Sequence, residues 1–245
     1  MRTANPALNQ KTFQQFHVSN TSVTMTLDGT VLKTGILLLA VAVAAAFSWS
    51  QLAGGAPLAR PFLMGSLIGG FVFALVTIIK PAWSPLTAPL YAIFEGIFLG
   101  AISLMFNGLY PGIVFQAVVL TFGTLFALLV AYRSGLIRAT ENFKLGVCAA
   151  TGGVGMIYLT SFVLGWFGVG IPYIHEAGLG GIGFSLVVVV IAALNLVLDF
   201  DFIEKGVESG APKYMEWYGA FGLIVTLVWL YLEFLRLLAK LRDYR

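Results

Sequence analysis

Long apolar runs separated by short polar connections occupy most of the chain from residue 34 onward. Their approximate positions are residues 34–52, 61–79, 86–106, 112–132, 145–167, 181–202 and 218–239. A helix needs about 20 apolar residues to cross roughly 30 Å of hydrocarbon, and each run is about that long. The runs lack the apolar and polar alternation of membrane-barrel strands. The pattern therefore predicts an all-α membrane protein, a bundle of seven transmembrane helices.

The region before the first run has a different character. Residues 1–32 are rich in Asn, Gln, Ser and Thr and show no helical apolar stripe, which predicts a polar N-terminal tail ahead of a membrane domain at 33–241. The first apolar run begins too late to resemble a cleavable secretory signal. We therefore expect it to remain as a span.

Composition excludes several classes of protein. The chain is 59% hydrophobic and 10% charged, with a mean hydropathy of +0.92, far from the range of soluble domains. Its net charge of +3 is too small to indicate a nucleic-acid partner, so the lipid bilayer is the expected environment. The single cysteine, Cys148, excludes an internal disulfide, and His17 and His175 are isolated. We expect no cofactor and no enzymatic activity.

The distribution of basic residues predicts the topology. A cytoplasmic N-terminus places most of them on the cytoplasmic side of a cell membrane, as the positive-inside rule requires. This group comprises Arg2, Lys11, Lys33, Lys80, Arg133, Arg138, Lys144, Lys205 and Lys213. The basic C-terminal end would then lie outside if all seven helices cross. Two interpretations stay open: the first helices set the orientation, or the last helix is re-entrant.

Two aspartates, Asp199 and Asp201, lie at the end of the sixth apolar run. At 100° per residue, Asp201 shares a helix face with Glu204, Lys205 and Glu208, which predicts a solvated stripe on an exposed helix extension.

Asp199 points about 200° away from Asp201, onto the face that carries Asn195. An aspartate at the centre of a span costs about 2.5 to 3.5 kcal/mol of insertion free energy, so acids there are usually functional. The alternative is an acid that reaches the membrane interface.

Two further acids lie within predicted spans. Glu95 is interpreted either as a functional carboxylate or as a hydrogen-bonded tie between the third helix and a neighbour. Glu233 lies three residues before Arg236, so a local ion pair on the helix surface is a sufficient explanation for it.

Two segments resemble the Bax inhibitor-1 family of membrane proteins: "LDFDFIEKG" and, after a short connection, "LYLEFLRLLAKL". The matching positions are Asp199 with Ile203, then the run from Leu230 to Phe234, and Leu235 with Arg236. The resemblance extends over about residues 33–241, and a long polar tail is similar to a bacterial branch of the family. It implies a seven-helix protein with a central last helix that mediates a pH-sensitive calcium leak.

The resemblance also implies site residues. In the family, paired aspartates on the last two helices share a proton and gate the pore, and a basic residue at the end of the second helix acts as a latch. Asp199 corresponds to the first aspartate and Lys80 to the latch. The Leu-Tyr-Leu-acid motif assigns the second position to Glu233, whereas a gapless alignment assigns it to Thr226. Asp199 and Glu233 would then be the calcium ligands, since calcium prefers carboxylate oxygens.

A second function remains open beside the leak. In it, the chain is a non-transporting membrane interaction protein, a scaffold or a regulator of a membrane protease, and Asp199 only ties helices together. Its partners would be other membrane proteins rather than calcium or other cations.

Overall fold

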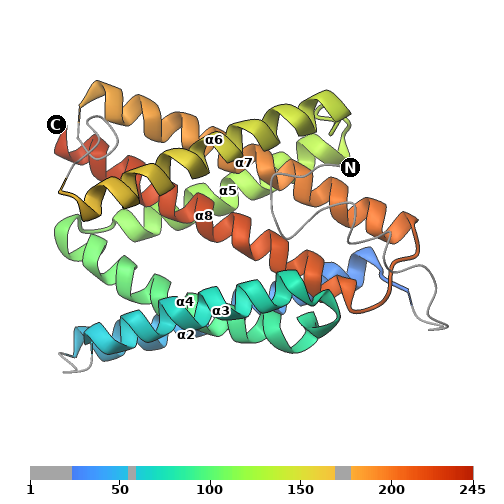
Figure 1. Cartoon of the computed structure of the whole chain (residues 1–245), viewed down its shortest axis with the longest axis horizontal. Coiled ribbons are helices and arrows are strands. Elements are labelled where there is room, and N and C mark those ends of the chain that lie inside the picture. The colour runs from blue at the N-terminus through green and yellow to red at the C-terminus, as the bar shows by residue number, and fades with distance from the viewer. Residues whose placement is uncertain (1–23, 55–58, 169–177, 245) are drawn as a thin grey trace. The chain divides into compact units, whose positions relative to one another are not determined.

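The computed structural model describes residues 24–54, 59–168 and 178–244 (Figure 1). These residues form seven long helices and one short 3₁₀ helix, η1, and they confirm the predicted all-α class. The elements are α2 (Leu27–Ala53), α3 (Ala59–Ile79), η1 (Pro81–Trp83), α4 (Ser84–Leu109), α5 (Ile113–Arg133), α6 (Glu141–Trp166), α7 (Leu179–Glu208) and α8 (Met215–Asp243).

Each predicted apolar run coincides with one of these helices. Among the described residues, six helical segments are long and apolar enough to cross a membrane, and α3 contributes a shorter apolar stretch, Leu63–Ile79. The last helix, α8, is continuous over 29 residues and has the largest buried share of the six. Its length and composition are sufficient for a full crossing of a membrane.

The first helix begins earlier than the sequence pattern predicts. We expected a polar tail up to residue 32, but α2 starts at Leu27. Thr26 is the N-cap, and its hydroxyl accepts a hydrogen bond of 3.1 Å from the Gly29 N–H. This side-chain cap satisfies one of the N–H groups that the first turn leaves without a helical partner, and so the helix extends before its apolar run.

The chain divides into two compact units, which we describe separately. The described part of unit 1 comprises residues 110–200 and 226–244, and that of unit 2 comprises residues 24–109 and 201–225. The boundaries fall inside α7 and α8, so each of these two helices contributes to both units. Asp199 and Asp201 therefore belong to different units.

In unit 2, α2 and α3 both pack against α4 (Figure 1). Gly96 and Gly100, one helical turn apart on α4, lie against the backbone of α2. A Cβ at Gly96 would lie 2.5 Å from the Val41 carbonyl oxygen, and one at Gly100 would collide with the Ala45 carbonyl. The two glycines thus permit a close helix contact that any larger residue would prevent.

The connection between α7 and α8 starts with a glycine-dependent cap. Gly210 has φ +67°, the Ala211 N–H donates to the Gly206 carbonyl, and the Gly210 N–H donates to the Val207 carbonyl. These two bonds are a Schellman motif, which ends a helix where glycine adopts the left-handed conformation. The cap turns the chain toward Lys213 and the start of α8.

Candidate functional site

Asp199 lies on the buried face of α7 in unit 1. Its exposed fraction is 0%, and Asn195, one turn earlier, is 2% exposed. The Asn195 side-chain amide donates to the Thr151 hydroxyl on α6 and to the Ile191 carbonyl, both at 2.8 Å. The prediction that Asp199 faces inward with Asn195 is confirmed. The amide also ties α7 to α6, a use of the side chain that the sequence pattern did not specify.

Glu233 is fully buried on α8 in the same unit. Its carboxylate accepts hydrogen bonds from the Tyr158 hydroxyl at 3.0 and 3.1 Å and from the Trp229 Nε1–H at 3.2 Å. Arg236, one turn further on, donates from Nη1 at 2.7 Å. The expected ion pair with Arg236 is confirmed, but the expected surface position is wrong, because Tyr158 and Trp229 cover the carboxylate. We call these four residues the Glu233 cluster.

One cation of this cluster, Arg236, and a second cation beside it, Lys240, lie over aromatic rings. The Arg236 guanidinium lies 5.2 Å from the centre of the Tyr158 ring, and the Lys240 ammonium lies 6.0 Å from that of Phe184. Lys240 also donates to the Ser185 hydroxyl at 2.8 Å and to the Gly181 carbonyl at 3.0 Å. These contacts join the C-terminal half of α8 to the start of α7.

At the end of α8, Asp243 accepts a hydrogen bond of 2.5 Å from the Tyr110 hydroxyl. Arg242 donates to the Pro111 carbonyl at 2.9 Å. The hydrogen bond to Asp243 raises the pKa of the Tyr110 hydroxyl, since it stabilises the neutral phenol. The turn between α4 and α5 thus receives the C-terminal end of the last helix.

Asp201 does not lie on a solvated stripe as predicted. It is 8% exposed and its carboxylate pairs with Lys205 at 2.8 Å, one helical turn later in unit 2. Glu204 and Glu208 are exposed, as predicted for that face. The ion pair explains the difference, because Lys205 neutralises the carboxylate and lets it lie in a largely buried position.

The remaining predicted residues have separate environments. Lys80 is exposed in unit 2, and its ammonium lies 4.3 Å from the centre of the Trp83 ring. Glu95 lies at the contact of α4 with α3, where a Cβ at Gly70 would be 3.1 Å from its Oε2. Both interpretations of Glu95, as a functional carboxylate and as a tie between helices, stay predictions. Thr226 is 3% exposed on α8 in unit 1, so both alignment registers select a buried polar residue.

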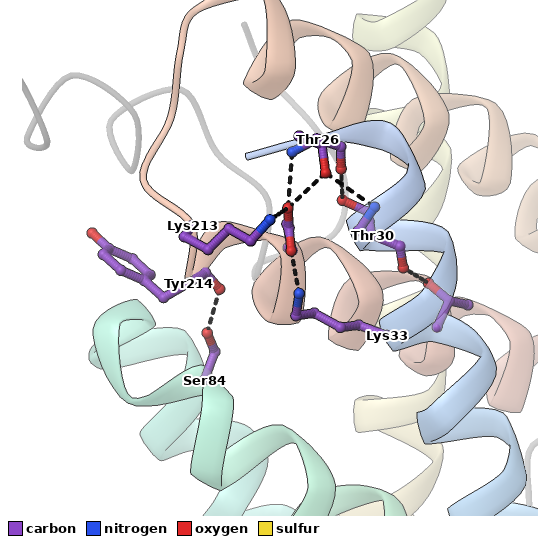
Figure 2. A network of polar contacts seen from close by, with 9 residues as sticks. Thr26, Thr30, Lys33, Ser84, Lys213 and Tyr214 are labelled. Carbon is purple, nitrogen blue, oxygen red and sulfur yellow. Dashed lines mark hydrogen bonds and ion pairs between the residues drawn. The ribbon is translucent and has the colours of Figure 1, made fainter. Parts of the chain in front are cut away.

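A second buried glutamate, Glu216, forms a cluster in unit 2 with three residues from other segments or turns. Its Oε1 accepts from the Thr26 N–H and hydroxyl, both at 2.9 Å, and from Lys213 at 2.8 Å (Figure 2). Its Oε2 pairs with Lys33. We call Thr26, Lys33, Lys213 and Glu216 the Glu216 cluster.

Next to this cluster, the Ser84 hydroxyl at the start of α4 donates to the Tyr214 carbonyl at 2.9 Å (Figure 2). Burial raises the pKa of the Tyr214 hydroxyl to about 12, because its charged form would be poorly solvated. The Ser84 hydrogen bond thus holds the α7–α8 connection to α4, while the Lys33 ion pair holds the first turn of α8 to α2.

The sequence pattern did not predict the Glu216 cluster. The signal available in the sequence was a Lys213 and Glu216 pair three residues apart at a helix start. Lys33 and Thr26 are more than 180 residues away along the chain, so no local pattern links them to Glu216.

Among the residues that the structure describes, no group of three or more His, Cys, Asp or Glu side chains is arranged to hold a metal ion. Calcium binding by Asp199 and Glu233 therefore stays a prediction.

Comparison with known families places the chain. A family model described as Bax inhibitor 1 like matches residues 5–243, nearly the whole length. The chain belongs to the Bax inhibitor 1 like family. This assignment confirms the family that the α7 and α8 motifs indicated. A search of curated proteins found no match, and neither did a search of solved structures.

Proposed function

We propose that this Bax inhibitor 1 like protein is a pH-sensitive calcium leak of the cell membrane, gated by the protonation of Asp199 on α7 and Glu233 on α8. One observation carries the proposal: both carboxylates are fully buried, on membrane-spanning helices, within the same unit. Acids at membrane depth are costly and are typical of ion and proton pathways.

The physical basis is the response of buried carboxylates to protons. Two carboxylates that approach each other in a low-dielectric site do not both ionise easily, so they exchange protons as a pair. Loss of a proton adds repulsion between the two helices that carry them. Carboxylate oxygens are also the ligands that calcium prefers. In this proposal Tyr158, Trp229 and Arg236 orient Glu233, since their hydrogen bonds fix its position.

In this proposal the N-terminus lies in the cytoplasm and the protein catalyses no reaction. Nine of the fourteen basic residues lie in segments that are on the inner side when the N-terminus is cytoplasmic, which supports that orientation. We propose no cofactor and no enzymatic reaction, so calcium enters only as the transported ion. Lys80 remains the proposed latch, and its exposed position over Trp83 supplies a cation at the end of α3.

One observation favours the alternative of a non-transporting scaffold or protease regulator. Glu233 already has a charged partner in Arg236, and Asn195 already ties α7 to α6. Buried polar groups with such partners are also common as structural ties in membrane bundles.

The test is calcium flux into proteoliposomes that contain the purified protein, measured across about pH 5 to 8. We compare the unmodified protein with Asp199→Asn, Glu233→Gln and Thr226→Val. Asp201→Asn is the matched control, because it removes a neighbouring carboxylate of the same helix that has its own ion pair. We expect pH-dependent flux that Asp199→Asn and Glu233→Gln both make independent of pH, while Asp201→Asn leaves the dependence intact.

Two other outcomes would contradict parts of the proposal. Folded protein that passes no calcium at any pH contradicts the leak and supports the scaffold. If Glu233→Gln retains the pH dependence that Asp199→Asn abolishes, Glu233 is not the partner carboxylate. An effect of Thr226→Val in that case supports the gapless register.

A further inference from the structure

The segment before α2 is attached to the connection between α7 and α8. Thr24 and Pro212 form an isolated antiparallel bridge, and the Met25 N–H donates to the Ala211 carbonyl at 2.7 Å. Met25 is 1% exposed and packs near Gly219 of α8. Segments from opposite ends of the sequence are thus joined within unit 2.

The Glu216 cluster completes this attachment. Thr26 has three roles: its hydroxyl caps α2, and its hydroxyl and its backbone N–H both donate to Glu216. Glu216 lies in the first turn of α8, where the helix dipole favours a negative charge. The starts of α2 and α8 are therefore connected through one carboxylate. It accepts hydrogen bonds from Thr26, and its negative charge interacts favourably with the dipole of α8.

The charges of the cluster come from three segments. Lys33 lies in the second turn of α2, Lys213 in the connection and Glu216 on α8. Both ammonium groups reach the same carboxylate (Figure 2). The side chain of Glu216 is 0% exposed, that of Lys33 is 14% exposed and that of Lys213 is 46% exposed. A buried charge without partners is costly, so the carboxylate holds its position only while these partners are in place.

Glycine makes room for the carboxylate. A Cβ at Gly29 would collide with both carboxylate oxygens of Glu216. Gly35, two turns later on the same helix, has no such neighbour, because nothing lies within 4 Å of the corresponding Cβ. The pocket that receives Glu216 therefore depends on a missing side chain at one specific position of α2.

We propose that the Glu216 cluster is an N-terminal latch, which fastens the segment Thr24–Thr26 and the first turn of α2 to the first turn of α8. While the latch is closed, Glu216 lies against Gly29 and holds the bridge between Thr24 and Pro212 together. Displacing the carboxylate opens the latch and separates the N-terminal segment from the α7–α8 connection. The proposal is independent of calcium transport.

The test is disulfide trapping across the bridge. Cys148→Ser removes the native thiol, and Thr24→Cys with Pro212→Cys introduces a pair. Opposed residues of an antiparallel pair have Cβ atoms about 4.5–5.5 Å apart, close to the 3.5–4.5 Å that a disulfide needs. In full-length protein in detergent, we expect mild oxidation to crosslink this pair efficiently.

Substitutions in the Glu216 cluster and at Gly29 are then combined with the cysteine pair. Gly29→Ala and Gly35→Ala are matched, since both replace a glycine of α2 by alanine and only the first displaces Glu216. We expect Gly29→Ala, Glu216→Gln and Lys33→Gln to lower the crosslinking rate about tenfold, a change of the size expected from losing a hydrogen bond to a charged group. Gly35→Ala and Asp201→Asn are expected to leave it unchanged.

Three results would contradict the proposed N-terminal latch. The first is that the parent pair fails to crosslink, and the second is that Gly29→Ala and Gly35→Ala crosslink equally. The third is that Asp201→Asn lowers the crosslinking rate as much as Lys33→Gln does. If Glu216→Gln yields no folded protein, the two alanine variants decide, because neither removes a charge.

Discussion

Helix α8 carries two fully buried glutamates, one in each unit, and their partners differ in origin. Glu216 is bound by Thr26 and Lys33, which are far away in the sequence, and by Lys213. Glu233 has its charged partner, Arg236, one turn away on its own helix, and its distant partner, Tyr158, is neutral. A carboxylate with distant charged partners joins segments through ion pairs, whereas Glu233 is joined to α6 through a neutral hydroxyl.

The largest effect that tests this comparison is expected for Glu216→Gln. Removing the carboxylate charge leaves two ammonium groups, Lys33 and Lys213, around a buried amide. Breaking a buried ion pair typically costs 3–5 kcal/mol, and because Lys213 is half exposed we expect the lower end, a loss of about 3 kcal/mol in the free energy of unfolding. Equilibrium unfolding in detergent measures it. A loss below about 1 kcal/mol would show that the cluster is a surface network in energetic terms.

Glu233→Gln is expected to have a smaller effect on stability. The glutamine oxygen still accepts from Tyr158 or Trp229, and Arg236, whose side chain is 47% exposed, can turn to water. Losing one charged hydrogen bond predicts about 1.5 kcal/mol in the same unfolding experiment. A loss equal to that of Glu216→Gln would remove the distinction between the two glutamates.

The sequence predicted the helices well because each apolar run fixes its own span. All seven runs became helices, and the inward face of Asp199 and Asn195 followed from helical periodicity. The early start of α2 was missed, because a hydroxyl cap and not an apolar residue sets it.

The polar clusters were beyond local patterns. Glu233 with Arg236 could be predicted from spacing, but Tyr158, 75 residues away, could not. The same holds for Thr26 and Lys33 around Glu216. Long-range hydrogen bonds depend on how helices pack, and the periodicity of a single helix does not encode the identity of its neighbours.

The two lysines of the Glu216 cluster sharpen the comparison further. Lys33→Met removes the more buried ammonium, and we expect a loss of about 1 kcal/mol in the free energy of unfolding, while Lys213→Met costs less than about 0.5 kcal/mol because water screens an exposed pair. Unfolding curves of the two variants at low and high salt give the comparison. A greater effect of Lys213→Met would mean that the pair nearest in sequence dominates and that the cluster does not join distant segments.

The smallest effect is expected for Tyr158→Phe, which deletes the one hydroxyl that reaches Glu233 from α6. Hydrogen bonds between membrane helices contribute about 0.6 kcal/mol on average, so we expect a loss of that size in the free energy of unfolding. Trp229 and Arg236 still keep the carboxylate in place. Thr26→Val deletes the corresponding hydroxyl at Glu216 and also removes the α2 cap. For this variant we expect a loss of about 1 kcal/mol in the free energy of unfolding. Double-mutant cycles with Glu233→Gln and Glu216→Gln separate the carboxylate contact from the cap. If Tyr158 couples to Glu233 more strongly than Thr26 couples to Glu216, then Glu233 also joins distant segments, and the distinction between the two glutamates is lost.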